Sequence, residues 1–282
     1  MTATAPVKTI LVTGATDGIG RATALGLAER GAQVLVHGRR GDKVDQVCAE
    51  IARTAPNAPA AEGYLADLSS LAEVRALAEQ VGAAHPRLDV LINNAGVFVK
   101  ERQLSPDGFE LTWAVNHLAP FLLTHLLLPA LRAAPARVVT VSSVAHNRGQ
   151  IHWDDLQLER GWDGPHPGPP LPGYPAYAQS KLANVMFSNE LARRVEAEGV
   201  TSNSLHPGVI GTKLLEDGFG IQGGTTASGA ETSIYLALSE DVAGVSGRYF
   251  SDCRETQTSP AAMNVTAQRR LWEISAEMTG LA

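Results

Sequence analysis

The sequence predicts an α/β domain built on a doubly wound parallel sheet of seven strands flanked by helices, as a single domain over residues 1–282. Short apolar, β-branched runs alternate with alanine- and leucine-rich segments of helical length. A glycine-rich turn follows the first run, and later runs end in small, amide or hydroxyl residues. Neither an internal repeat nor a domain boundary interrupts this alternation.

Composition excludes several function classes. The net charge of −6, with scattered Lys and Arg, does not favour nucleic-acid binding. The two cysteines, Cys48 and Cys253, lack metal or redox spacing, so we expect inert thiols in a reducing cytoplasm and no metal site. The N-terminus lacks the apolar segment of a signal peptide, and uninterrupted apolar runs stay below the ~18 residues of a membrane span.

The first unit is a strand at residues 9–13, a glycine-rich turn, a helix at 21–30 and a strand at 33–37. The turn contains Gly14, Asp17, Gly18, Ile19 and Gly20. Glycines in such a turn allow the backbone to approach a pyrophosphate closely. The N–H groups at the helix N-terminus then stabilise the negative charge of the pyrophosphate. The spacing differs from the strict G-x-G-x-x-G fingerprint, but the strand–turn–helix context predicts a Rossmann-like dinucleotide site rather than a merely tight turn.

The end of the second strand indicates which dinucleotide binds. An NAD site would place Asp or Glu there, close to the ribose 2′-hydroxyl. Here Arg39 and Arg40 follow His37-Gly38, and the first acid is Asp42. Guanidinium groups suit a 2′-phosphate, so NADP(H) is favoured, NAD(H) is left open, and the alternative is a solvated basic loop.

The next elements also end in polar residues. A helix is expected at 42–54, a loop at 55–61 and a strand at 63–68, which ends in Asp67-Leu68. The Asp67 carboxylate either accepts a hydrogen bond from an adenine amino group or caps a turn. Ser70 and Glu73 predict a capping box for the following helix. The strand at 88–92 precedes Asn93-Asn94-Ala95-Gly96, which either line a ligand crevice or brace the sheet.

The middle of the chain adds two polar features. Asn116 lies inside a helix predicted over 109–131, where a poor helix former indicates a hydrogen-bonding role or a kink. The strand at 137–143 ends in Ser142-Ser143. Residues 144–176 are rich in Pro, Gly and Trp, which predicts a substrate-side insert or, alternatively, an ordered surface loop.

Tyr177 and Lys181 lie four residues apart, so both occupy one face of the helix predicted over 177–198. A phenol ionises near pH ~10. An adjacent ammonium stabilises the phenolate and is expected to lower that pKa. The alternative is a tyrosine packed on the aliphatic part of the lysine side chain.

After the helix at 177–198 we expect strands at 201–205 and 247–250, helices at 232–239 and 268–278, and a glycine-rich candidate lid within 213–229.

These motifs, in this order, resemble the short-chain dehydrogenase/reductase family, and the insert with Ser180-Lys181-Leu182-Ala183-Asn184 resembles its retinol dehydrogenase/WW-domain oxidoreductase-like branch in a soluble form. Arg39 matches that branch, whereas Gly38 and Asp17 depart from it. The resemblance implies catalytic Asn116, Ser143, Tyr177 and Lys181, with Ser142 as the alternative serine. It implies cofactor contacts from Gly14, Asp17, Gly18, Ile19, Gly20, Arg39, Arg40, Asp67, Leu68, Asn94, Ala95, Gly96, Tyr177, Lys181, Pro207, Gly208 and Thr212.

The resulting hypothesis is an NADP(H)-dependent oxidoreductase that interconverts an alcohol and an aldehyde or ketone. Its partner is a small carbonyl or alcohol substrate. Members of the family are often dimers or tetramers, so the resemblance allows a homo-oligomer without requiring one. A dinucleotide sensor with a vestigial site is the alternative, and a sugar-nucleotide epimerase needs a larger C-terminal domain than the chain offers. The substrate, the physiological direction and the oligomeric state do not follow from the sequence.

Overall fold

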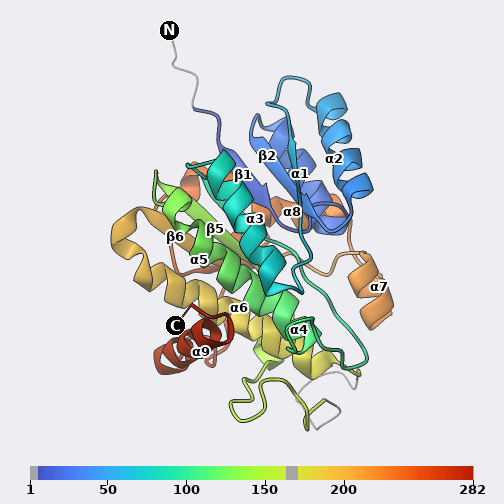
Figure 1. Cartoon of the computed structure of the whole chain (residues 1–282), viewed down its shortest axis with the longest axis vertical. Coiled ribbons are helices and arrows are strands. Elements are labelled where there is room, and N and C mark those ends of the chain that lie inside the picture. Colours follow the sequence, from blue (N-terminus) through green and yellow to red (C-terminus); the bar gives the residue numbers. More distant parts are fainter. Residues whose placement is uncertain (1–5, 163–170, 221, 282) are drawn as a thin grey trace.

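One mixed sheet with helices on both faces forms the molecule (Figure 1). The computed structural model describes residues 6–162, 171–220 and 222–281. The strands are β1 (Thr9–Val12), β2 (Gln33–Gly38), β3 (Glu62–Leu65), β4 (Val90–Asn93), β5 (Ala136–Val141), β6 (Val200–His206), β7 (Tyr249–Ser251) and β8 (Arg254–Glu255). Their spatial order is β3-β2-β1-β4-β5-β6-β7-β8, so the chain reverses its winding direction between β1 and β4. Open α/β sheets bind ligands at such a reversal, outside the carboxyl ends of the strands.

The seven predicted parallel strands are confirmed, and an eighth strand corrects the expected sheet. Strand β8 pairs antiparallel with β7 and places Arg254 opposite Ser251. The turn between them consists of Asp252 and Cys253, which have φ values of 50° and 57°. Left-handed φ at both turn positions matches the twist of a two-residue hairpin. The sequence signal was missed because β8 is only two residues long.

Helices cover each face of the sheet. The α-helices are α1 (Gly18–Glu29), α2 (Gly41–Thr54), α3 (Leu71–Ala84), α4 (Leu111–Trp113), α5 (Ala119–Leu131), α6 (Tyr174–Arg194), α7 (Lys213–Phe219), α8 (Thr226–Leu238) and α9 (Val265–Met278). The 3₁₀-helices are η2 (Val144–Arg148), η3 (Glu196–Glu198) and η4 (Glu240–Val242), and η1 (Ala114–Leu118) is a π-helical turn. Helices α3, α5 and α6 pack on one face, and α1, α2 and α8 pack on the other.

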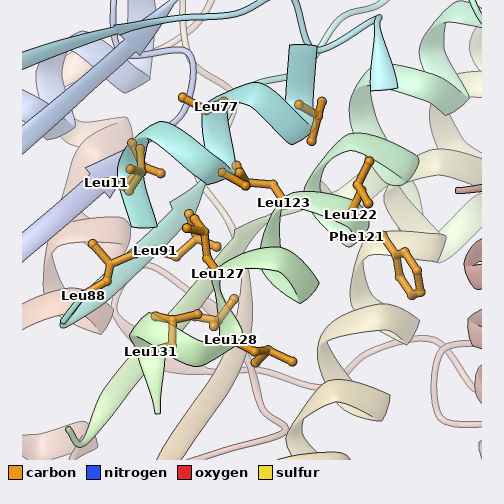
Figure 2. Packing of buried hydrophobic residues seen from close by; sticks show 14 of the residues in the cluster. Leu11, Leu77, Leu88, Leu91, Phe121, Leu122, Leu123, Leu127, Leu128 and Leu131 are labelled. Atoms are coloured by element: carbon orange, nitrogen blue, oxygen red, sulfur yellow. The ribbon is translucent and has the colours of Figure 1, made fainter. Parts of the chain in front are cut away.

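Leucines of two helices and two strands form much of the core on the α3–α5 face (Figure 2). Leu77 of α3 and Leu127 of α5 pack among Leu11 and Leu91 of the sheet, and all are at most 1% exposed. Full burial of such a side chain contributes about 1.5–3 kcal/mol. The continuous helical segment Leu111–Leu131 has the length and mean hydropathy (1.4) of a membrane span, but 83% of that window is buried inside the protein. Its place in Figure 2 is that of a core helix.

Local differences from the expected elements have identifiable causes. The helix expected over 109–131 contains the π-helical turn η1 around Asn116, so both the expected hydrogen bonding and the local distortion are present. Helix α6 begins at Tyr174 because Pro175 occupies its first turn. Helix α8 begins six residues earlier than expected, where the hydroxyl of Thr225 accepts a 3.2 Å hydrogen bond from Ser228 N. The capping box is half formed, since Glu73 accepts from Asp67 N instead of Ser70 N.

The two segments expected to be irregular are partly regular. In the insert, η2 is helical, and Trp162 Nε1 donates a 3.1 Å hydrogen bond to Lys100 O. The Pro/Gly cluster at 163–170 lies outside the described residues. The candidate lid at 213–229 contains α7 and the start of α8. Between these helices, Gly224 N donates to Val209 O at 2.8 Å, which ties this segment to the residues after β6. The segment is therefore partly helical, and its role as a lid stays a prediction.

Candidate active site

A cleft of about 800 Å³ opens at the carboxyl ends of the parallel strands, at the winding reversal between β1 and β4. Nearly every sequence-predicted site residue lines it. These are Gly14, Asp17, Gly18, Ile19, Gly20, Arg39, Asp67, Leu68, Asn94, Ala95, Gly96, Ser142, Ser143, Tyr177, Lys181, Pro207, Gly208 and Thr212. Arg40 and Asn116 are predicted site residues that do not line the cleft.

The glycine turn leaves room for a ligand only because it lacks side chains. A Cβ on Gly20 would lie 2.1 Å from Gly14 O and 2.4 Å from Asn94 Nδ2, so no other residue fits without a backbone shift. Gly14 has a φ of +64°, which L-residues with side chains rarely adopt. The turn leads directly into the N-terminus of α1. A bare backbone at a helix N-terminus fits the pyrophosphate of a dinucleotide.

A buried histidine that the sequence analysis did not assign holds this turn to the sheet. His37 Nδ1 accepts a 3.1 Å hydrogen bond from Gly14 N, and its Nε2 lies 3.1 Å from Ala66 O, to which it donates. Burial lowers the pKa of His37 to about 4, so the ring is neutral at physiological pH. His37 therefore fixes the glycine turn against β2 and the end of β3. A polar residue in an otherwise apolar strand was the available signal.

Asp17 lies in the turn and caps α1, where its Oδ1 accepts from Gly18 N at 2.8 Å. Its other carboxylate oxygen lies 3.2 Å from Lys213 Nζ. Lys213 starts α7, so this ion pair joins the glycine turn to the segment that follows β6. Lys213 was not predicted, because nothing in the local sequence relates it to a turn nearly two hundred residues earlier.

The two arginines after β2 have different environments. The Arg39 side chain is 68% exposed in the cleft, and its Nη1 lies 3.9 Å from Asp67 Oδ2. Arg40 points to Asp42, with an Nη2–Oδ2 distance of 2.6 Å, and lies outside the cleft. Of the two arginines predicted to contact the cofactor, only Arg39 lines the cleft. Asp67 caps a turn, since its Oδ1 accepts from Ser69 N at 2.9 Å, and it also lines the cleft, so its contact with an adenine stays a prediction.

The residues after β4 brace the sheet and line the cleft at once. Asn94 Nδ2 donates to Thr13 O at 2.8 Å and to Gly14 O at 3.3 Å, which ties β4 to the glycine turn. A Cβ on Gly96 would lie 3.3 Å from Asn116 Oδ1 and 3.4 Å from Lys181 Nζ. Gly96 therefore occupies the space beside Asn116 and Lys181.

Asn116 is fully buried and its side chain is already hydrogen-bonded. Its Oδ1 accepts from Val97 N at 2.7 Å, and its Nδ2 donates to Val97 O at 2.9 Å and to Ser180 Oγ at 3.0 Å. It thereby fixes the loop after β4 against α6. The structure supports a positioning role for Asn116 and does not place it among the cleft-lining residues.

Tyr177 and Lys181 meet Ser143 at one wall of the cleft. The Ser143 hydroxyl hydrogen-bonds Tyr177, whereas Ser142 Oγ donates to Lys181 O at 2.7 Å and is engaged in holding α6 to β5. This difference favours Ser143 over Ser142 as the serine that is available to a ligand. Lys181 Nζ donates to Val141 O at 3.1 Å and lies 5.6 Å from the centroid of the Tyr177 ring.

The electrostatics of this pair differ from the sequence expectation. Burial raises the pKa of Tyr177 to about 12, and the hydrogen bond from Ser143 acts in the opposite direction. Burial lowers the pKa of Lys181 to about 8. The expected lowering of the tyrosine pKa by Lys181 is not found in this structure, because desolvation dominates both groups and the ammonium is directed to a backbone carbonyl.

Aromatic and apolar side chains that the sequence analysis did not assign form the neighbouring wall. Tyr174 and Phe219 line the cleft, where the Phe219 ring lies 5.7 Å from the Tyr177 ring, centroid to centroid, and Tyr174 packs edge-on to Phe219. Phe98 is not among the lining residues and packs against Tyr177 with its ring at 5.4 Å. Val144 and Val209 also line the cleft and are about half exposed. These residues come from the β4 loop, η2, α6, the β6 loop and α7, so no local pattern groups them.

The fold and the cleft define a dinucleotide-binding α/β protein with a tyrosine, a lysine and a serine beside the ligand space. Within the described part of the chain, no three or more His, Cys, Asp or Glu side chains are grouped so as to hold a metal ion. Comparison with known proteins agrees with this class. The family profile of the short chain dehydrogenases matches residues 8–154.

Individual relatives cover nearly the whole chain. Human retinol dehydrogenase 14 is 41% identical over 97% of this chain and 87% of its own length, and bovine retinol dehydrogenase 12 is 43% identical with the same coverage. A crystal structure of a protein from Mycobacterium paratuberculosis superposes with a TM-score of 0.79 at 34% identity, covering 97% of this chain and 93% of its own. A short chain dehydrogenase from Escherichia coli CFT073 complexed with NADPH gives 0.72 at 26% identity, covering 88% and 97%.

The chain therefore belongs to the short-chain dehydrogenase/reductase family, in the retinol dehydrogenase-like branch. It is an oxidoreductase that acts on CH–OH groups and binds a nicotinamide dinucleotide.

Proposed function

We propose that this enzyme interconverts an alcohol with an aldehyde or ketone, uses NADP(H) in preference to NAD(H), and employs Tyr177 as its general acid/base. The observation that carries the proposal is the meeting of Tyr177, Ser143 and Lys181 at the wall of the cleft that also contains the bare glycine turn. The bound dinucleotide supplies or accepts the hydride.

Each side chain has a defined task in this proposal. The buried Tyr177 hydroxyl is protonated at neutral pH, because its pKa is raised to about 12, and it donates a proton to the carbonyl oxygen during reduction. Ser143 donates a hydrogen bond to the same oxygen and holds it next to Tyr177. Lys181 stabilises the phenolate that remains and holds ribose hydroxyls of the dinucleotide. Asn116 holds the loop after β4 against α6 through its hydrogen bonds to Val97 and Ser180.

The preference for NADP(H) depends on Arg39. Its guanidinium is exposed in the cleft at the end of β2, where a ribose 2′-phosphate would be recognised, and no carboxylate follows β2 before Asp42. Asp67, at 3.9 Å, is too distant for a tight ion pair and leaves donors available to a phosphate. The structural relative complexed with NADPH is consistent with this choice.

Tyr177→Phe tests the proposal. We expect turnover of every carbonyl substrate to fall at least about 10³-fold, because the proton donor is lost, while the affinity for NADPH stays within a few-fold. Turnover is followed by the absorbance of the reduced nicotinamide with a panel of aldehydes, ketones and alcohols. Tyr235→Phe, in α8 and outside the cleft, is the matched control and is expected to be fully active.

Two outcomes would contradict the proposal. Preserved turnover in the Tyr177→Phe variant would refute the role of the tyrosine. Tight NADPH binding by the wild-type protein without turnover of any substrate would favour a dinucleotide sensor. The intact set of Ser143, Tyr177 and Lys181 argues against that alternative, because a sensor has no need of a proton donor beside the ligand.

A further inference from the structure

The charged side chains that line the cleft have partners, with one exception. Asp17 pairs with Lys213, Arg39 lies near Asp67, and the buried Lys181 donates to a backbone carbonyl. Arg148 lines the same cleft, is exposed, and makes no hydrogen bond or ion pair with any described residue. Within the described part of the chain, Arg148 is therefore the one charged side chain of the cleft that has no partner.

Arg148 lies on the substrate side of the cleft. It ends η2, which begins directly after Ser143 at the end of β5. The cofactor-side residues follow β1 and β2, and strand β4 lies between β1 and β5 in the sheet. Arg148 is thus separated from the glycine turn and from Arg39, which are the groups placed to meet the phosphates of a dinucleotide.

The backbone that carries Arg148 is held firmly against α6. The next residue, Gly149, packs so closely that a Cβ there would lie 2.4 Å from Ala178 O and 2.9 Å from Leu182 Cβ. The charge of Arg148 opposes the rise that burial causes in the pKa of Tyr174, which lines the same cleft. Tyr174 lies three residues, a rise of about 4.5 Å along α6, before the reactive Tyr177.

Apolar groups gather around Tyr177 on the same side of the cleft as Arg148. Ala145, Tyr174 and Tyr177 form one buried cluster, against which Phe98, Leu214 and Phe219 pack. Val144 adds an apolar side chain that is 51% exposed at the cleft. A ligand that spans this wall has a reactive oxygen at Tyr177, an apolar body, and a far end near Arg148.

We propose that Arg148 selects substrates that carry a carboxylate at the end remote from the reacting carbonyl or alcohol, separated from it by an apolar chain. The planar guanidinium matches a carboxylate through two parallel hydrogen bonds. A 2-oxo acid is too short, because its carboxylate would lie at Tyr177 itself. This inference rests on the proposed alcohol–carbonyl chemistry and specifies the substrate class of the same site.

Azelaic semialdehyde and nonanal, which differ by a terminal carboxylate, test the proposal. With NADPH, the wild-type enzyme is expected to show a KM for azelaic semialdehyde at least about threefold below that for nonanal. Arg148→Leu is expected to raise the KM for azelaic semialdehyde about fivefold, with kcat nearly unchanged and nonanal unaffected. Arg148→Lys is expected to keep part of the KM difference between azelaic semialdehyde and nonanal. The matched control is Arg269→Leu, which removes an exposed arginine of α9.

A measurement of binding separates this inference from the proposed function. Nonanoate and nonanol are titrated calorimetrically into the NADPH complex of the wild-type protein and of Arg148→Leu. If nonanoate binds more tightly than nonanol and Arg148→Leu removes this difference, the carboxylate site is supported. This conclusion holds even if neither aldehyde is turned over, because a lack of turnover would refute only the proposed chemistry. Equal losses for both ligands, or no wild-type preference for the carboxylate in binding or KM, would overturn the inference.

Discussion

The two halves of the cleft recognise their ligands by different means. On the cofactor side the surface is mostly backbone: Gly14 and Gly20 keep side chains out, while His37 and Asn94 hold the turn in place. On the substrate side the surface is mostly side chain, with Val144, Tyr174 and Phe219 lining the cleft beside Tyr177. The shape of the cofactor half is determined by the conformation of the backbone. The shape of the substrate half is determined by side chains from several segments that are distant in the sequence.

This contrast explains the tolerance expected of each half. A backbone cradle fails when one atom is added, because the neighbouring atoms are main-chain groups that cannot rotate away. A side-chain wall can change its shape by substitution at one position, and with it the preferred substrate. The cofactor half is therefore expected to be intolerant of substitution, and the substrate half adaptable.

The largest effect is expected from Gly20→Ala. The added Cβ would lie 2.1 Å from Gly14 O, so the turn must shift, and we expect NADPH affinity to fall at least about 100-fold and the free energy of unfolding to fall by about 1–3 kcal/mol. Calorimetry and denaturant titration measure both. Gly82→Ala in α3, with nothing within 4 Å, is the control and should stabilise the protein by up to about 1 kcal/mol. Unchanged NADPH affinity in Gly20→Ala would show that the turn does not form the cradle.

An intermediate effect on cofactor affinity is expected from Arg39, the one side chain of the cofactor half that is proposed to select NADPH. Arg39→Ala should weaken NADPH binding about tenfold and leave NADH binding nearly unchanged, because only NADPH has the 2′-phosphate. Arg40→Ala is the matched control, and it should leave both affinities almost unaltered, since Arg40 pairs with Asp42 outside the cleft. Equal losses for NADPH and NADH in Arg39→Ala would contradict the assigned role, and so would a larger effect of Arg40→Ala.

The smallest effect is expected at Lys181, where the two halves meet. Burial lowers the pKa of Lys181 to about 8, so the ammonium is protonated below that pH and loses its charge above it, while Tyr177 keeps its proton. The kcat/KM for carbonyl reduction should therefore decline above pH 8, by less than about tenfold per pH unit. Lys181→Arg, which stays protonated, should lose this decline. The same decline in the arginine variant would assign it to another group.

Sequence reasoning succeeded where function depends on local backbone geometry. Gly14, Gly18 and Gly20 lie in a strand–turn–helix unit whose conformation is dictated within a few residues, and the structure places all three at the cleft. It was less successful with Arg40, because the choice between a ligand and a neighbouring carboxylate two residues away is made by side-chain orientation. It assigned Asn116 to the site, whereas the folded chain uses its amide to hold Val97 and Ser180.

The sequence by itself determined the order of the seven parallel strands, the bare turn at the first helix, and the identity of the tyrosine, lysine and serine that line the cleft. These follow from short-range rules, since hydrophobic periodicity and the absence of a Cβ act within one element. Only the tertiary structure decided that burial raises the tyrosine pKa, that Lys213 pairs with Asp17, and that Arg148 lines the cleft with no counterion among the described residues. Desolvation and charge pairing depend on atoms brought together from distant segments, and no local pattern in the chain records that proximity.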